Sequence, residues 1–178
     1  MKTLSYRIPN KAPNWAPVTR DLDLDIRLKA FAALGALAAQ NGGVVTSEQL
    51  NRGFEFEGKQ VPFWNPRKGI WRPRILGDGP ALSVYTAAPN PKRPPRYNDQ
   101  GLSDRFIYRY EGTNPKLWTN VAVRRAMETA RPIIYLLGVT PGLYLPVFPC
   151  SVVADDPANL SFHLMVDAVG LGGAATEG

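Results

Sequence analysis

In the segment from Phe106 to Tyr110, aromatic side chains alternate with Ile107 and Arg109, and an arginine in this setting could recognise an anion. On a strand, Tyr108 and Tyr110 share one face while Arg109 points to the other, because successive side chains alternate. If the arginine face is concave, Arg109 is placed to contact a phosphate or a base edge. The competing interpretation is an exposed arginine that pairs with a nearby acid.

The segment from Tyr144 to Val152 could form an apolar binding surface. Its two prolines, Pro146 and Pro149, lack backbone N–H groups, so we expect the segment at a sheet edge or in a bulge. There it would present an apolar wall and leave backbone N–H groups free for a ligand. The wall would consist of Phe148, Pro149 and Val152, and the N–H groups would be those of Cys150 and Ser151. The competing interpretation places Phe148 and Val152 in the core.

No arrangement of residues in the sequence indicates catalysis or metal binding. Cys150 is the only cysteine and His163 the only histidine, so a disulfide within the chain and a Cys/His zinc site are excluded. We expect Cys150 to be a buried small residue rather than a nucleophile. Asp155, Asp156 and Pro157 are typical of a turn rather than of a metal site. The chain is therefore expected to be a binding module, not an enzyme, with no cofactor.

Positive charge is concentrated in the middle of the chain. Residues 59–125 contain 13 Lys and Arg against four Asp and Glu, a net charge of +9, whereas the whole chain carries +6. Aromatic residues are interleaved with these cations, which is typical of a surface that binds nucleic acid. A basic solvated surface over an aromatic core is the alternative. The cations expected to contact a DNA backbone or groove are Arg67, Lys68, Arg72, Arg74, Lys92, Arg93 and Arg96.

Three helices must position these residues. The first is expected from Asp21 to Gly42-Gly43, with an apolar face formed by Leu24, Leu28, Phe31 and Leu34. Thr46 and Gln49 fit a capping box, which predicts a short helix over residues 47–52. The third helix is expected to begin at Thr119 or Asn120 and to end before Pro132, with Arg124 and Arg125 facing solvent.

The remaining elements are strands, so the fold class is predicted to be α+β. A hairpin is expected over residues 54–61, with its turn at Glu57-Gly58. Further strands are expected over residues 81–86, 105–110, 133–137, 143–147, 151–153 and 160–166. Together they would form a small mixed sheet or a barrel-like domain with one or two helices.

The chain is divided into an extended arm (1–20), a single recognition domain (21–168) and a linker (169–178). Within the domain, residues 21–64 have a winged-helix-like order and residues 65–168 are rich in strands. A helical cap packed on a β domain is the alternative to the winged helix. The sequence contains no apolar run long enough to span a membrane and no signal peptide, so a cytoplasmic protein is expected.

Several ordered segments resemble the N-terminal region of a group of bacterial HNH restriction endonucleases. The segments are Gly69–Pro73, Phe106–Pro115, Asn120–Ala126, Pro132–Val139, Gly142–Pro149 and Val152–Pro157. The resemblance extends from about Asp21 to Asp167. It implies the reader domain of a modification-dependent (type IV), McrA-like enzyme, joined in the parent protein to a C-terminal HNH nuclease whose motif this chain lacks. A reader of this kind would associate with the bacterial nucleoid when bound.

Within this group the chain is most similar to the sulfur-binding domain, which recognises phosphorothioate-modified double-stranded DNA. In that family the sulfur occupies a surface cavity lined by an aromatic-Pro pair, a small apolar residue and a nearby arginine. The matching residues are Phe148, Pro149, Val152 and Arg109, and Tyr108 stands where the family can have His. The implied pocket is therefore formed by Tyr108, Arg109, Phe148, Pro149, Cys150, Ser151 and Val152.

Two other functions are compatible with the sequence. An SRA-like reader of 5-methylcytosine would flip the base into an aromatic pocket, for which Tyr85, Tyr110 or Trp118 could supply a ring. A basic protein-interaction domain would instead use the cations of residues 59–125 to bind an acidic partner.

Overall fold

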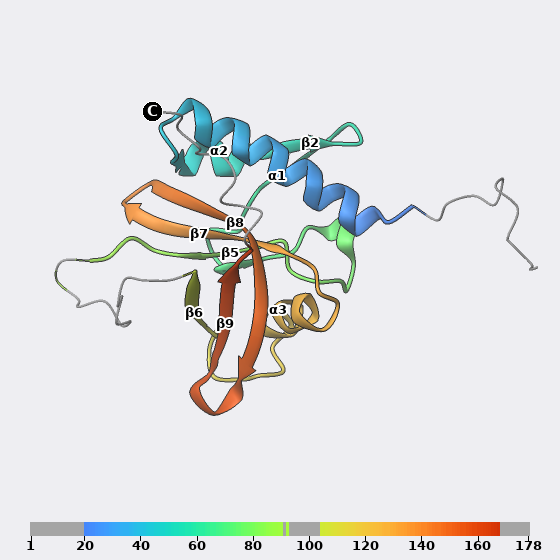
Figure 1. Cartoon of the computed structure of the whole chain (residues 1–178), viewed down its shortest axis with the longest axis vertical. Coiled ribbons are helices and arrows are strands. Elements are labelled where there is room, and N and C mark those ends of the chain that lie inside the picture. Colours follow the sequence, from blue (N-terminus) through green and yellow to red (C-terminus); the bar gives the residue numbers. More distant parts are fainter. Residues whose placement is uncertain (1–19, 91, 93–103, 168–178) are drawn as a thin grey trace, which may run out of the picture.

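The structure, a computed structural model, describes residues 20–90, 92 and 104–167. The predicted DNA contacts Arg93 and Arg96, the arm up to residue 19 and the linker lie outside the described residues. Helices pack around a curled mixed sheet, and a small second sheet lies beside it (Figure 1). The predicted α+β fold class is confirmed.

The main sheet has the strand order β4-β5-β7-β8-β9-β6, and β1 joins it through β8. Its strands are β1 (Val45–Thr46), β4 (Ile70–Trp71), β5 (Ser83–Thr86), β6 (Arg105–Arg109), β7 (Ile133–Thr140), β8 (Leu143–Asp156) and β9 (Ser161–Val166). Only the pairing of β5 with β7 is parallel among these described strands. The second sheet is the predicted hairpin, β2 (Phe54–Phe56) with β3 (Lys59–Val61).

The helical elements are α1 (Leu22–Gln40), α2 (Ser47–Arg52), α3 (Trp118–Glu128) and the short 3-10 helices η1 (Arg74–Leu76) and η2 (Pro157–Asn159). The capping box predicted at α2 is present, because Thr46 accepts from the Gln49 backbone N–H and the Gln49 side chain accepts from the Thr46 N–H. This reciprocal capping satisfies two N–H groups that the helix itself leaves without partners.

The N-terminal segment packs on the main sheet rather than standing apart from it. One hydrophobic cluster contains Ile26 and Leu34 of α1, Phe54 of the hairpin, and Ile134 and Tyr144 of the sheet. The second cluster lies on the other face of β7, because side chains alternate along that strand, and it is covered by α3. The N-terminal segment and the main sheet therefore share one core.

The buried face of α1 differs from the predicted face. Leu24 and Leu28 are 37% and 55% exposed, whereas Ile26, Arg27 and Leu34 are fully buried. The helix presents apolar residues on more than one side, and the side that contacts the sheet is the one that carries Arg27.

The Arg27 guanidinium joins α1 to the segments that lead into two neighbouring strands, β5 and β7. Its Nε and Nη2 donate to the two carboxylate oxygens of Asp23, at 2.6 and 3.1 Å. The other three bonds go to the backbone carbonyls of Ala81, Pro132 and Pro80, at 2.7, 3.0 and 3.1 Å. Since guanidinium has five N–H donors, none remains unsatisfied in this buried position.

The start of α3 also differs from the prediction. The N-cap is Leu117, which makes no side-chain capping bond, and the predicted cap Asn120 lies inside the first turn. The Asn120 side chain instead bonds to the backbone N–H and C=O of Glu111 and to the C=O of Asn114, all within 2.9 Å. A buried amide with partners in the preceding loop can fix that loop, so Asn120 serves the loop rather than the helix end.

Replacing Arg27 by Met should lower the free energy of unfolding by about 3–5 kcal/mol, because the carboxylate and three carbonyls would lose their buried donor. Urea unfolding followed by circular dichroism measures this difference. The matched control is Lys29→Met, two residues further on the exposed side of the helix, which should change the value by less than about 0.5 kcal/mol. Equal effects of the two substitutions would contradict the structural role of Arg27.

Candidate functional site

The predicted binding surface on β8 lies in a bulge and not at a sheet edge. β8 is paired with β7 on one side and with β9 on the other. Between the pairs Ile133–Cys150 and Tyr135–Val147 the register shifts by one residue, and the extra residue is on β8. The bulge contains Phe148 and Pro149, which are joined by a cis peptide bond. Of the two predicted locations, the bulge is confirmed.

The bulge separates the residues of the predicted apolar wall. Phe148 packs against the α1 side, where its ring stacks on Phe31 with centroids 5.6 Å apart. Cys150 and Val152 are buried in the second cluster, on the other face of the sheet. Phe148 and Pro149 are half-buried, so they are the part of the wall that reaches the surface. Their role in ligand binding stays a prediction.

Cys150 is the buried small residue that the sequence predicts. Its side chain is fully buried, and its Sγ donates to the Val147 carbonyl at 3.4 Å. Burial raises the pKa of the Cys150 thiol to about 12, and the charge of Asp167 adds to this effect. The thiol therefore stays protonated near neutral pH, and a nucleophilic role is unsupported because the thiolate is the reactive form.

Arg109 is not level with the bulge. It pairs with Ser161 of β9, which in turn pairs with Asp156 near the far end of β8. Arg105 pairs with Met165, and Met165 pairs with Ser151. Four residues of strand span about 13 Å, so Arg105 is the arginine that lies level with Ser151. Sequence reasoning missed it, although the alternation that places Arg109 also places Arg105 on the same face.

The arginine face of β6 is the outer face. Arg105 and Arg109 are exposed, whereas Tyr108 and Tyr110 point into the second hydrophobic cluster. The concave face considered for Arg109 is therefore occupied by the tyrosines and by core residues. Contact with a ligand would have to occur on the outside of the sheet.

Tyr108 links the two ends of the curled sheet. Its hydroxyl donates to the Gly69 carbonyl at 3.0 Å and lies 3.4 Å from the Tyr85 carbonyl. β6 is the last strand in the sheet order, and Gly69 directly precedes β4, the first strand. A Cβ at Gly69 would meet this hydroxyl at 3.0 Å, and Gly69 has a φ of 72°, so glycine suits the position. Tyr108 therefore has a structural role.

The link brings together two basic segments from the two opposite ends of the strand order. Lys68 Nζ lies 3.3 Å from Glu111 Oε1, two residues after the end of β6 at Arg109. We call Arg67, Lys68, Arg105 and Arg109 the basic edge; all four side chains are exposed. Its two halves are more than 30 residues apart in the sequence and come together only because the sheet curls.

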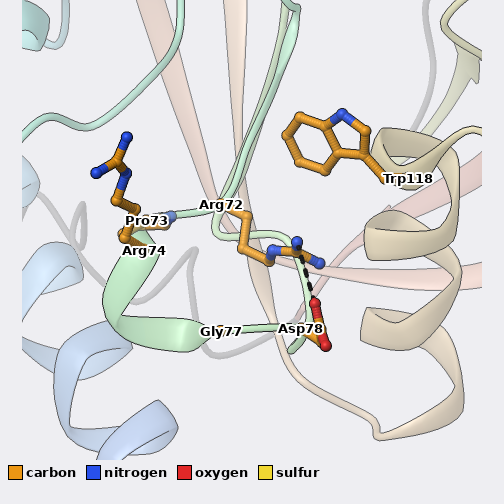
Figure 2. Close-up of a pocket in the computed structure, with 6 residues that line it drawn as sticks. All are labelled: Arg72, Pro73, Arg74, Gly77, Asp78 and Trp118. Atoms are coloured by element: carbon orange, nitrogen blue, oxygen red, sulfur yellow. Dashed lines mark ion pairs between the residues drawn. The ribbon is translucent and has the colours of Figure 1, made fainter.

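Arg72 and Arg74 lie apart from the basic edge and behave differently from each other. The Arg72 side chain is only 14% exposed, and its guanidinium lies 5.2 Å from the Trp118 ring centroid. It also donates to the Gly79 carbonyl at 3.2 Å. Arg74 is exposed and points away from Arg72 and Trp118 (Figure 2). Arg72 thus has protein partners where an exposed DNA contact was expected. Lys92, another predicted contact, is exposed.

Arg124 also has protein partners, where the sequence predicted a solvent-facing residue. It bonds to Asp155 at 2.5 Å, to the Tyr110 hydroxyl at 3.2 Å and to the Pro115 carbonyl at 3.2 Å. The Tyr110 hydroxyl donates to the same carboxylate. Burial, together with the bond to Asp155, raises the pKa of Tyr110. These contacts hold the loop after β6 against α3 and β8. Arg125, by contrast, donates to the backbone carbonyl of Asp78.

The rings considered for a flipped base are mostly engaged in the fold. Tyr85 is half-buried, donates its hydroxyl to the Pro66 carbonyl and contacts Trp64 at a centroid distance of 4.8 Å. Tyr110 belongs to the Arg124 network. Trp118, in contrast, is 44% exposed.

Within residues 20–90, 92 and 104–167, no group of three His, Cys, Asp or Glu side chains is placed to hold a metal ion. In the same part of the chain, no helix has the length and apolar character that crossing a membrane requires. Comparisons with protein-family models, with curated proteins and with solved structures found no match to this chain. No function is therefore transferred to it from a relative.

Cys150 should be inert in the folded protein because its thiol is buried and protonated. With an aromatic disulfide reagent at pH 8, we expect no reaction of the native protein over minutes and one thiol per chain after unfolding in urea. Above pH 9, the thiol ionises in the unfolded chain before it ionises in the folded chain. The contribution of Cys150 to stability is therefore present below the unfolded pKa and is lost as pH rises towards about 12. Rapid reaction of the native thiol at pH 8 would contradict its burial.

Proposed function

We propose that this chain is a DNA-binding module that recognises phosphorothioate-modified duplex DNA. The observation that carries the proposal is the basic edge, where the curl of the sheet gathers four exposed cations from two distant segments. Several cations on one surface suit a duplex, because it carries one phosphate charge per about 1.7 Å of helix axis. The proposal rests on this charge and on the resemblance of the sequence to sulfur-binding reader domains.

General DNA affinity would come from the basic edge and from neighbouring exposed cations. Lys68 shares its charge with Glu111, so its contribution should be smaller than that of Arg67. Arg74 and Lys92 are exposed and add positive charge outside the edge. Contacts of this kind position a protein on the duplex and carry little sequence information.

Selectivity for sulfur would come from the exposed part of the bulge. A non-bridging sulfur keeps the phosphate charge but is a larger atom and a poor hydrogen-bond acceptor. Against Phe148 and Pro149, an unmodified oxygen would lose water without gaining a donor, which costs about 1–3 kcal/mol. This corresponds to a preference of about ten- to a hundredfold.

The charge of the modified phosphate requires a cation near the bulge. Arg105 is level with Ser151 across β9, so we assign it this role in place of Arg109. The Ser151 hydroxyl donates to Asp167 at 2.6 Å. That hydroxyl is therefore not available to the modified phosphate. The negative charge of the Asp167 carboxylate would repel the phosphate, so a nearby cation is needed to compensate both charges.

The discriminating experiment uses one duplex sequence in three forms: phosphorothioate-modified, 5-methylcytosine-modified and unmodified. Fluorescence anisotropy should give the tightest binding to the phosphorothioate form, by about tenfold or more. Phe148→Ala should reduce the ratio between the modified and unmodified forms. Equal affinity for all three would leave a general DNA binder, and preference for the methylated form would favour a methylcytosine reader.

The salt dependence of the affinity for DNA tests whether the chain binds DNA through the basic edge or serves instead to bind an acidic protein partner. With four to six phosphate contacts, the logarithm of affinity should fall with the logarithm of salt at a slope of about −4 to −5. Arg109→Ala should make the slope shallower by about 0.9, because one contact is lost. Arg52→Ala, an exposed arginine on α2 near the other end of β8, is the matched control and should leave the slope unchanged. A flat response of the unsubstituted protein would contradict binding through the basic edge.

A further inference from the structure

A cavity of about 350 Å³ lies where η1 and the following loop meet the start of α3. It is lined by Arg72, Pro73, Arg74, Gly77, Asp78 and Trp118 (Figure 2). Its volume is within the range of small-molecule sites in proteins, which begins at about 300 Å³. The basic edge and the bulge contribute no residue to this lining.

The walls of the cavity are held in place by two arginines. Arg72 donates to the Gly79 carbonyl at 3.2 Å, and Arg125 donates to the Asp78 carbonyl. Gly79 is packed so closely that a Cβ would lie 2.8 Å from the Leu76 carbonyl oxygen. The loop is therefore tied to α3 through Arg125 and to the segment after β4 through Arg72.

Two groups in the cavity have capacity left for a ligand. Trp118 is 44% exposed, although its ring already lies 5.2 Å from the Arg72 guanidinium. The Asp78 side chain is 96% exposed and lies 3.9 Å from the Arg72 guanidinium, so its carboxylate can still accept hydrogen bonds. A ligand that satisfies both groups has a flat π system and an N–H donor at its edge.

A nucleobase has both features, and the phosphate of its nucleotide complements the cations Arg72 and Arg74 of the lining. Stacking of a base on an aromatic side chain tolerates any base, whereas a carboxylate selects bases with an exocyclic amine, as in its pairing with cytosine N4. Arg74 lines the cavity but points away from Trp118 (Figure 2), so its exposed guanidinium is available to a phosphate that flanks the base. In a paired and stacked duplex, the faces of the bases are not accessible to Trp118.

We propose that this cavity binds a single unpaired nucleotide with an amino-bearing base such as cytosine. The base stacks on Trp118 beside Arg72, and its exocyclic amine donates to Asp78. This assignment rests on the proposed function for the choice of a nucleic acid, and it adds a second contact of a different kind to the backbone contacts of the basic edge.

The test compares three duplexes of one unmodified sequence: fully paired, with one bulged cytidine, and with one bulged thymidine. Fluorescence anisotropy with the whole chain should give about tenfold tighter binding to the cytidine bulge than to the paired duplex. The thymidine bulge should fall between them. Trp118→Leu should reduce binding of both bulges to the level of the paired duplex, while Trp118→Phe should retain part of the gain.

A second substitution, at Asp78, tests the proposal even if Trp118→Leu prevents folding. Because the Asp78 side chain is almost fully exposed, Asp78→Ala should fold normally. It should abolish the difference between cytidine and thymidine bulges and leave binding of the paired duplex unchanged. Leu28→Ala, an exposed apolar residue on α1, is the matched control and should change nothing.

The outcomes separate the two proposals. If the paired duplex binds and the bulges give no gain, the nucleotide site is overturned and the DNA-binding function stands. If a cytidine bulge and a short single-stranded oligocytidine bind but the paired duplex does not, the nucleotide site stands and duplex reading fails. If none of these DNAs binds, the nucleotide site is overturned, and absence of binding to the phosphorothioate duplex as well would overturn the proposed function.

Discussion

The fold depends on one buried cation. Arg27 uses all five of its N–H donors on Asp23 and on three backbone carbonyls in the segments that lead into β5 and β7. These two strands form the parallel pair of the sheet, so a single side chain sets α1 against the place where the two strands begin. A buried charge is tolerated only when it is paired and hydrogen-bonded, and this position meets both conditions. This one side chain therefore ties α1 to the main sheet.

The elements that the sequence predicts well are those whose signals are local. The capping box of α2 and the turn of the hairpin each lie within a few residues, and both form as expected. The buried face of α1 could not be found in this way, because the acceptors that make Arg27 a core residue are 53 to 105 residues away. Asn120 resembles a helix cap in sequence, but its partners are Glu111 and Asn114 in the preceding loop, and the helix signal does not indicate them.

The candidate site shows the same division between local and distant information. Alternation along β6 correctly separates Tyr108 from Arg109, and the prolines of β8 correctly indicate a bulge. The register between β6, β9 and β8 decides which arginine is level with Ser151. The local sequence of these three strands does not indicate that register. Apart from its aromatic ring, nothing in the sequence indicates that Trp118 lines a cavity. The other walls are formed by Arg72 and by the loop at Asp78, about 40 residues earlier in the chain.

The hydroxyl of Tyr108 has a mechanical consequence. In the described part of the chain no backbone ladder joins β6 to β4, so the curled sheet has a seam that this hydroxyl bridges. A neutral hydrogen bond contributes only about 1 kcal/mol, which makes the seam a weak line in an otherwise laddered sheet. Arg67 and Lys68 lie on one side of it and Arg105 and Arg109 on the other, and the ion pair of Lys68 with Glu111 also spans it. A polyanion that contacts cations on both sides of the seam would hold the two strands together, and binding and closure would then reinforce each other.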